Sequence, residues 1–163
     1  MIAILPFEEK HWEPVRDIYA EGLKTRNATF ETEVPMDSSW VKKFHPHLFW
    51  VATSEGNVVG WAGLQPVSPR KVYEGVVEVS VYIHPGHTGK GIGSTLMKHL
   101  IGQSEKGGIW TLYASIFPEN RASIKLHLAN EFREIGYREK IGQLDGKWRN
   151  TVLIERRSKK AGL

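Results

Sequence analysis

The chain has 163 residues, about the usual size of one domain, and 40% of them are hydrophobic, enough to form a core without disulfides or metals. It contains no cysteine, which excludes a disulfide scaffold, a thiol nucleophile and a zinc site built on sulfur. The formal charge of +4 is mild. A nucleic-acid-binding surface needs denser basic residues with interleaved aromatics, so we expect no nucleic-acid partner.

The two ends of the chain give no sign of targeting. Residues 1–6 lack a basic start and a long apolar run, so they do not resemble a signal peptide. No stretch approaches the length of a transmembrane span, and we expect a soluble, cytoplasmic protein without a membrane partner. Basic residues crowd the C-terminus, and we interpret residues 158–163 as a solvated basic tail behind a domain of residues 1–157.

Apolar periodicity predicts alternating strands and helices. The expected strands are residues 2–7, 49–53, 58–67, 76–83, 111–116, 134–140 and 148–156. The expected helices are residues 12–23, a short helix capped by Ser38 or Ser39 that ends before Pro46, residues 91–106 and residues 123–131. A Gly56-Asn57 turn joins the second and third strands into a hairpin. The alternation predicts a single α/β (α+β) domain with a mixed central sheet of about seven strands flanked by about four helices.

A glycine-dense turn follows the strongly apolar strand 76–83 and opens the helix 91–106. Such a turn exposes main-chain N–H groups, and the start of a helix adds unpaired donors and a positive dipole end. Gly89, Gly91 and Gly93 let the backbone come close to a ligand because they have no Cβ. The pattern predicts an anion site suited to phosphate or pyrophosphate.

Two common phosphate-binding loops do not match this turn. A Walker loop needs four residues between its first glycine and Gly-Lys, but Gly86 lies only two residues before Gly89. A Rossmann fingerprint needs a third glycine where this chain has Ser94. A tight turn that binds no ligand is the remaining alternative.

The segment from Thr88 to Gly93 resembles the signature of the GNAT superfamily of N-acetyltransferases, Gln/Arg-x-x-Gly-x-Gly/Ala. The match fails only at Thr88, and Lys90 or His87 could compensate for the missing side chain. Across nearly its whole length the chain looks like the phosphinothricin/methionine-sulfoximine acetyltransferase group. This similarity is carried by residues 27–30, 70–73, 77–83, 118–127 and 146–148.

The resemblance implies an acetyl-CoA-dependent N-acetyltransferase, with residues 1–157 as its catalytic domain. In this group the strand ending at Ile83 splays from residues 111–116, and the pantetheine arm of the cofactor inserts between them. The resemblance assigns the arm to the main chain of Val81, Tyr82 and Ile83 and to Asn120. It assigns the pyrophosphate to the amides of Gly89, Lys90, Gly91, Ile92, Gly93 and Ser94.

Two side chains are candidates for proton transfer, which an amine acceptor requires because ammonium is not nucleophilic. Glu78 lies inside an apolar strand, where a carboxylate is costly to bury without a role or a partner. A solvent-facing glutamate is the plain alternative, and the resemblance favours a general base. His127 follows Leu126 on a helix whose Ile124 and Leu128 are expected to face the core. The resemblance gives His127 a role at the departing thiolate, with Tyr82 and a simple core histidine as alternatives.

The acceptor side is predicted from the resemblance and from charge. Arg70 could bind a carboxylate through two hydrogen bonds, which suits an amino-acid-like amine of the phosphinothricin, methionine sulfoximine or methionine sulfone type. The further candidate substrate-binding residues are Phe30, Lys71, Val72, Tyr73 and Asn130. The histidines 45, 47, 84 and 87 have no carboxylate at ligand spacing, so no metal site is expected.

Three functional hypotheses therefore stand. The first is direct attack of a small-molecule amine on acetyl-CoA in a ternary complex, since no cysteine can carry an acetyl group. The second is a peptide or protein N-terminal acetyltransferase, which would need an open groove. The third is a non-catalytic acyl-CoA-binding module. Many relatives pair as dimers, so the resemblance allows a homodimer.

Overall fold

The computed structural model describes residues 1–163 as seven strands, three α-helices and short 3-10 helices. The strands are β1 (Ile2–Pro6), β2 (Phe49–Ser54), β3 (Asn57–Pro66), β4 (Val76–Ile83), β5 (Thr111–Ile116), β6 (Arg133–Leu144) and β7 (Lys147–Arg157). The α-helices are α1 (Trp12–Lys24), α2 (Ile92–Lys106) and α3 (Arg121–Leu128), and the 3-10 helices are η1 (Glu9–His11), η2 (Ser38–Lys43), η3 (Lys71–Tyr73) and η4 (Pro85–His87). No helix is long and apolar enough to cross a membrane.

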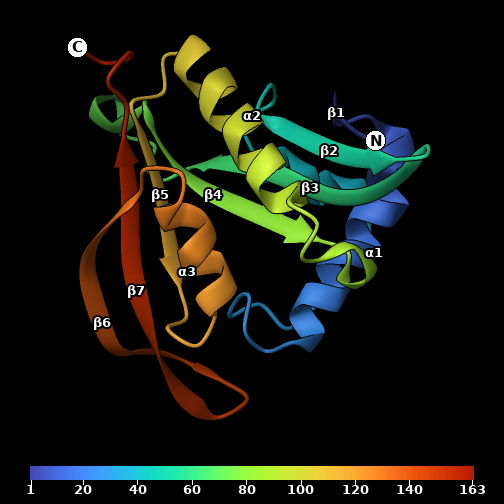
Figure 1. Ribbon diagram of the computed structural model, residues 1–163. Helices are drawn as coiled ribbons and strands as arrows, with labels where there is room; N and C mark the ends of the chain where they lie inside the picture. Colours follow the sequence, from blue (N-terminus) through green and yellow to red (C-terminus); the bar gives the residue numbers. More distant parts are fainter.

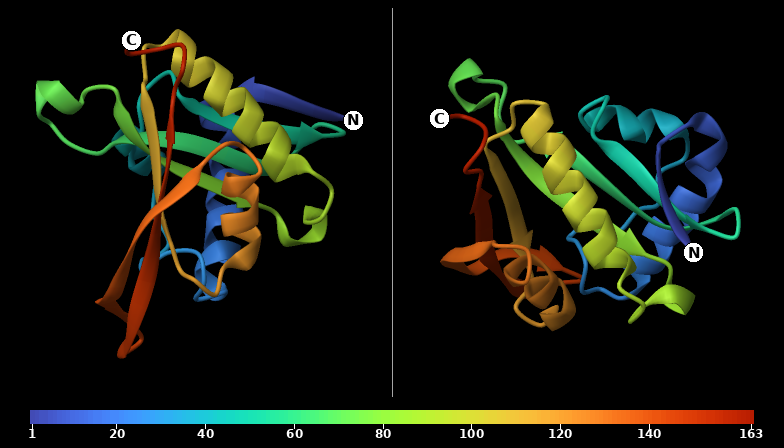
Figure 2. Two further views of the ribbon diagram at one scale, coloured as in Figure 1. Left: turned by 60° about the vertical axis from the view of Figure 1, so that its left-hand side comes forward. Right: turned by 45° about the horizontal axis from the view of Figure 1, so that its top comes forward.

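All seven strands form one sheet in the order β1-β2-β3-β4-β5-β7-β6. Every neighbouring pair is antiparallel except β4 and β5, which run parallel. The helix α2 crosses one face of this sheet, α1 lies behind the opposite face, and the β6–β7 hairpin extends beyond the other strands (Figures 1 and 2). The predicted mixed sheet of seven strands and its four helices, with η2 as the short one, are confirmed.

Two apolar layers hold these elements together, one on each face of the sheet. The larger layer packs β-strand side chains against α2, with Leu96, Met97 and Leu100 fully buried. The smaller one packs α1 and η2 against Trp61. The strand β4 contributes to both, because Val77 and Val79 face the larger layer and Tyr82 the smaller one.

The only parallel strand pair is also the shortest. The strands β4 and β5 pair from Val76 opposite Thr111 to Glu78 opposite Tyr113, and no further. Beyond this point β5 stays paired with β7 as far as Ile116, so residues 79–83 have no strand on their β5 side. The expected splay of these two strands is confirmed.

The ends of several elements differ from the predictions. Asp37, not Ser38 or Ser39, caps η2, because its carboxylate accepts from the Ser39 amide. The hairpin between β2 and β3 turns at Glu55 and Gly56, both with positive φ. The helix α3 begins earlier than expected because Asn120 Oδ1 accepts from the Ser123 amide as its N-cap.

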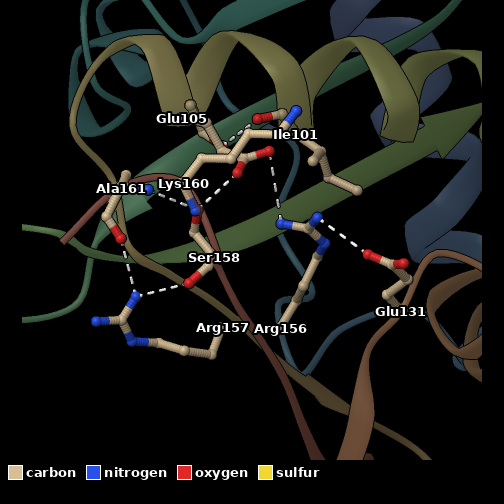
Figure 3. A network of polar contacts seen from close by, with 9 residues as sticks. Ile101, Glu105, Glu131, Arg156, Arg157, Ser158, Lys160 and Ala161 are labelled. Atoms are coloured by element: carbon tan, nitrogen blue, oxygen red, sulfur yellow. Dashed lines mark hydrogen bonds and ion pairs between the residues drawn. The ribbon is translucent and has the colours of Figure 1, made fainter. Parts of the chain in front are cut away.

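The C-terminal segment is partly packed against the domain, although its basic residues Lys159 and Lys160 are exposed. Ser158 and Ala161 are buried, and the Ser158 hydroxyl donates to Glu105 Oε2 of α2 at 2.6 Å. The Arg157 guanidinium donates to the carbonyls of Ser158, Ala161 and Gly162. Arg156 forms ion pairs with Glu105 and Glu131, joining the end of α2 to the turn after α3 (Figure 3). Arg156 and Arg157, which precede this segment, are therefore engaged in ion pairs and hydrogen bonds within the fold.

Gly75 fixes the base of the splay, because its carbonyl accepts from the amides of Trp110 and Thr111. A Cβ at Gly75 would lie 2.1 Å from the Trp110 ring. We therefore expect Gly75→Ala to lower the free energy of unfolding by about 1–3 kcal/mol, measured by urea denaturation.

Gly102→Ala is the matched control, since a Cβ there meets nothing within 4 Å and the residue lies inside α2. It should raise stability by about 0.5–1 kcal/mol. Equal stability of Gly75→Ala and the wild type would show that the ring moves aside freely.

Candidate active site

The separated strands β4 and β5 border a cleft of about 570 Å³. Its walls come from β4, from the segment between β5 and α3, and from residues 27–31 after α1. Glu78, Tyr82 and His127 all line it, although they come from distant parts of the sequence. The splay thus brings the main candidates for chemistry into one hollow.

The turn after β4 offers unpaired main-chain donors, and its first residue, Thr88, lines the cleft, whereas residues 89–94 do not. None of the amides from Thr88 to Ser94 donates to a main-chain carbonyl. Gly89 and Gly91 have φ of 74° and 78°, and a Cβ on either would meet no atom within 4 Å. Gly91 is the N-cap of α2, so the positive end of the helix dipole lies at the same turn. These features suit a phosphate group.

The residues predicted to hold the pyrophosphate, Gly89 to Ser94, form this turn and the first turn of α2. Lys90 is exposed, while Ile92 is buried and anchors the first turn of α2 in the core. A Cβ at Gly93 would lie 3.4 Å from Leu126, so this glycine allows α2 and α3 to approach. Thr88 lines the cleft, and its hydroxyl donates to the Pro85 carbonyl at 3.3 Å.

Glu78 lies at the last residue pair that β4 shares with β5, where the cleft begins. Glu78 is exposed by its surface area, as the solvent-facing alternative expects, but surrounding protein atoms still desolvate its carboxylate in part. This partial burial raises the pKa of Glu78, and the nearby Lys43 ammonium opposes the shift. A cleft carboxylate with a raised pKa can accept a proton from an amine more readily than an ordinary glutamate.

His127 is buried, and its two ring nitrogens have different surroundings. Nδ1 lies 2.7 Å from the Ser123 carbonyl, which can only accept, so Nδ1 carries the proton. Burial lowers the pKa of His127, and Nε2 is buried without a partner. The neutral ring therefore presents a lone pair and must accept a proton before it can donate one.

The helix face that carries His127 differs from the prediction. Ile124 and Leu126 pack against the larger apolar layer. Leu128, which was expected to face the core, is 46% exposed. The ring of His127 instead packs edge-on against Phe132, with centroids 4.8 Å apart.

The third candidate for proton transfer, Tyr82, belongs to an aromatic wall. Its ring stacks on Trp61 at 4.8 Å and meets Tyr19 edge-on at 5.1 Å. Burial raises the pKa of Tyr19 to about 12 and that of Tyr82 further. Both phenols therefore stay protonated near neutral pH. Gly22 gives this wall its room, because a Cβ there would lie 2.6 Å from Tyr82 Cε2.

The other predicted residues divide between the cleft and its surroundings. Val81, Tyr82, Ile83, Asn120 and Phe30 line the cleft. The Asn120 amide is already engaged, because Nδ2 donates to the Asn27 carbonyl and Oδ1 caps α3.

Arg70, Lys71, Val72 and Tyr73 were expected to bind the acceptor, but they lie outside the cleft on the exposed loop before β4. The Arg70 guanidinium packs over the Tyr73 ring at 5.2 Å. Asn130 does not line the cleft either, since it is buried and its Nδ2 donates to the Leu126 carbonyl at 2.8 Å.

Several cleft residues were not predicted. Thr29 and Glu31 line the acceptor side near Tyr19 and Tyr82, and the only available signal was their place in or beside residues 27–30, which carry part of the family resemblance. Lys43 lies over the Trp40 ring at 4.4 Å and interacts electrostatically with Glu31 and Glu78. Nothing local in the sequence indicates Lys43, because η2 reaches the site only through folding.

Comparison with known proteins shows which proteins this chain is similar to. Residues 12–132 match the acetyltransferase (GNAT) family. The chain is 36% identical over 147 residues to a phosphinothricin N-acetyltransferase of Alcaligenes faecalis, covering 85% of this chain and 74% of the relative. It is 30% identical to an L-methionine sulfoximine/L-methionine sulfone acetyltransferase of Pseudomonas aeruginosa, covering 82% of this chain and 73% of that protein.

A solved structure of a related acetyltransferase superposes closely on this chain. The phosphinothricin acetyltransferase of Sinorhizobium meliloti, crystallised with acetyl-CoA, superposes with a TM-score of 0.90 at 27% identity. The match covers 99% of this chain and 90% of the other.

The burial of neutral His127 makes stability depend on pH. Its pKa is lower in the folded chain than its ordinary value of 6.5, so the folded state binds fewer protons than the unfolded state. The stability that this residue contributes is complete above 6.5 and is lost as pH falls toward the folded pKa.

Urea denaturation at about pH 8 and about pH 5 should therefore show a smaller pH-dependent loss in His127→Gln than in the wild type. His47→Gln, at an exposed position, should keep the wild-type slope. An identical slope in all three proteins would contradict the burial of a neutral ring at this position.

Proposed function

The chain belongs to the acetyltransferase (GNAT) family, and we propose that it transfers the acetyl group of acetyl-CoA to the primary amine of a small amino-acid-like molecule. The observation that carries this proposal is the shape of one cleft. It is lined by Glu78, by the unpaired edge of β4 and by Thr88, the first residue of the turn whose amides from 88 to 94 make no main-chain hydrogen bond.

The residues present fit acetyl-CoA. The amides from Gly89 to Ser94 would hold its diphosphate, and the edge formed by Val81, Tyr82 and Ile83 would pair with its pantetheine arm. Asn120 would contribute less than the family pattern implies, because its amide already bridges Asn27 and α3. When bound, acetyl-CoA supplies the thioester carbonyl that an amine attacks and the thiol that leaves.

Two side chains of the protein, Glu78 and His127, would transfer the protons of the reaction. We assign to Glu78 the removal of a proton from the acceptor amine, directly or through a water. His127 lines the same cleft and its Nε2 has a free lone pair, so it would take up a proton released by the amine and pass it to the departing sulfur. The phenol of Tyr82 is too weakly acidic to be the better donor. No cysteine is present to carry the acetyl group, which supports direct attack in a ternary complex.

The relatives indicate the class of acceptor. Two of them act, by their names, on phosphinothricin and on methionine sulfoximine or sulfone. In this chain the acceptor side holds Glu31 and Glu78, which would attract an ammonium, with Lys43 as a nearby cation. A screen of amino acids, sulfoximines, sulfones, polyamines and peptides, reading free thiol, tests this assignment. Turnover of peptides alone would overturn it.

Replacement of Glu78 tests its assignment as the general base. We expect Glu78→Gln to lower kcat/KM about 10²- to 10⁴-fold near neutral pH, while acetyl-CoA affinity measured by calorimetry stays unchanged. The acidic limb of the pH–rate profile, which the raised pKa of Glu78 moves upward, should disappear in the variant. Glu134→Gln, on the exposed strand β6, is the control. Wild-type turnover in Glu78→Gln would remove this residue from the role.

Two glycines with the same backbone shape separate cofactor binding from stability. Gly91 and Gly56 have φ of 78° and 81°, and a Cβ added to either would meet no atom within 4 Å. Alanine at either should therefore cost about 1 kcal/mol of stability.

Only Gly91→Ala should also weaken acetyl-CoA binding, by about tenfold or more, because the side chain crowds the amide turn. Calorimetric titration and thermal melting of the two variants give the comparison. Equal acetyl-CoA affinity in both would contradict the placement of the diphosphate.

A further inference from the structure

Residues 27–35 form one wall of the cleft but make no hydrogen bonds from main chain to main chain. None of their amides donates to a main-chain carbonyl, and none of their carbonyls accepts from a main-chain amide. The wall nevertheless contributes Thr29, Phe30 and Glu31 to the cleft. Side chains from elsewhere must therefore hold it in place.

Arg149 of β7 contacts the start of this wall and the residue just before it. Its Nη1 donates to the Arg26 carbonyl at 2.8 Å, and its Nη2 lies 3.5 Å from Asn27 Oδ1. The same Nη2 is 3.5 Å from Glu119 Oε2. The guanidinium also covers the Phe117 ring at 4.0 Å. One side chain thus ties the end of α1 to the segment between β5 and α3.

Two further contacts run in parallel with Arg149. Asn120 Nδ2 donates to the Asn27 carbonyl at 3.1 Å. Phe30 packs edge-on against Phe117 at 4.8 Å, and the guanidinium covers the same Phe117 ring. All three contacts join the α1 side of the splay to the β5 side. The Arg149 side chain is only 18% exposed, so its contacts are less screened by water than those of a surface arginine.

We propose that Arg149 is a positioning residue for the acceptor: it fixes residues 26–31 across the splayed strands, where Thr29 and Glu31 line the same cleft as Glu78. This inference rests on the proposed function, because the cleft must accept an amine for the position of its wall to matter. It assigns Arg149 no contact with the reacting atoms. Loss of its side chain should loosen the acceptor wall and leave the amide turn at residues 88–94 intact.

Steady-state kinetics and hydrogen exchange of Arg149→Met test the proposal. We expect KM for the acceptor to rise about 10- to 100-fold and KM for acetyl-CoA to change less than about twofold. The amides of Asn27 and Glu31, which donate to the hydroxyls of Thr25 and Thr29, should exchange faster. Arg149→Lys keeps the charge but loses the forked geometry, so it should recover part of the acceptor affinity. Arg133→Met, which removes an exposed ion pair of the neighbouring strand β6, is the control.

The outcomes separate the two proposals. If Arg149→Met matches Arg133→Met in kinetics and exchange, or if both KM values rise together, the positioning role is wrong. If the wild type acetylates no amine, the proposed function is wrong. In that case the exchange of residues 27–31 still decides whether Arg149 holds this wall.

Discussion

The interruption of pairing between β4 and β5 is the constraint on which the site depends. Three residue pairs, ending at Glu78 and Tyr113, hold the strands together, and beyond them the strands diverge. A sheet edge exposed inside a protein is normally avoided, because unpaired main-chain groups are costly. Here it is the surface against which an extended ligand can pair. The same divergence leaves room for a cleft that both Glu78 and His127 line.

The two halves that the splay separates are joined again by side chains and by the base of the sheet. At the base, the Gly75 carbonyl accepts from Trp110 and Thr111, and α2 packs across strands from both halves. After α1, Arg149 and Asn120 donate to the carbonyls of Arg26 and Asn27. At the end of α2, the ion pairs of Arg156 join this helix to the turn after α3. These contacts surround the cleft and would keep its walls in place, which suits a reaction that needs two substrates aligned.

Local patterns in the sequence predicted the strands, the helices and the glycine-rich amide turn. The alternation of Val77, Glu78 and Val79 indicated the strand and its two faces, and the glycines of residues 89–93 indicated the amide turn. Such features depend on residues that are neighbours in the chain. Arg70 and Asn130 do not line the cleft, because the course of the loop before β4 and the exact end of α3 depend on packing, and their predicted role in acceptor binding stays a prediction. Lys43 and Arg149 were missed, since each reaches the site across more than one element.

A crystal structure of the protein grown with acetyl-CoA tests the central claim most directly. The account predicts the diphosphate within hydrogen-bonding distance of the amides between Gly89 and Ser94. It also predicts the pantetheine arm beside residues 79–83, with the thioester next to Glu78. A cofactor bound anywhere else, or a cleft left without it at saturating concentration, would contradict the account.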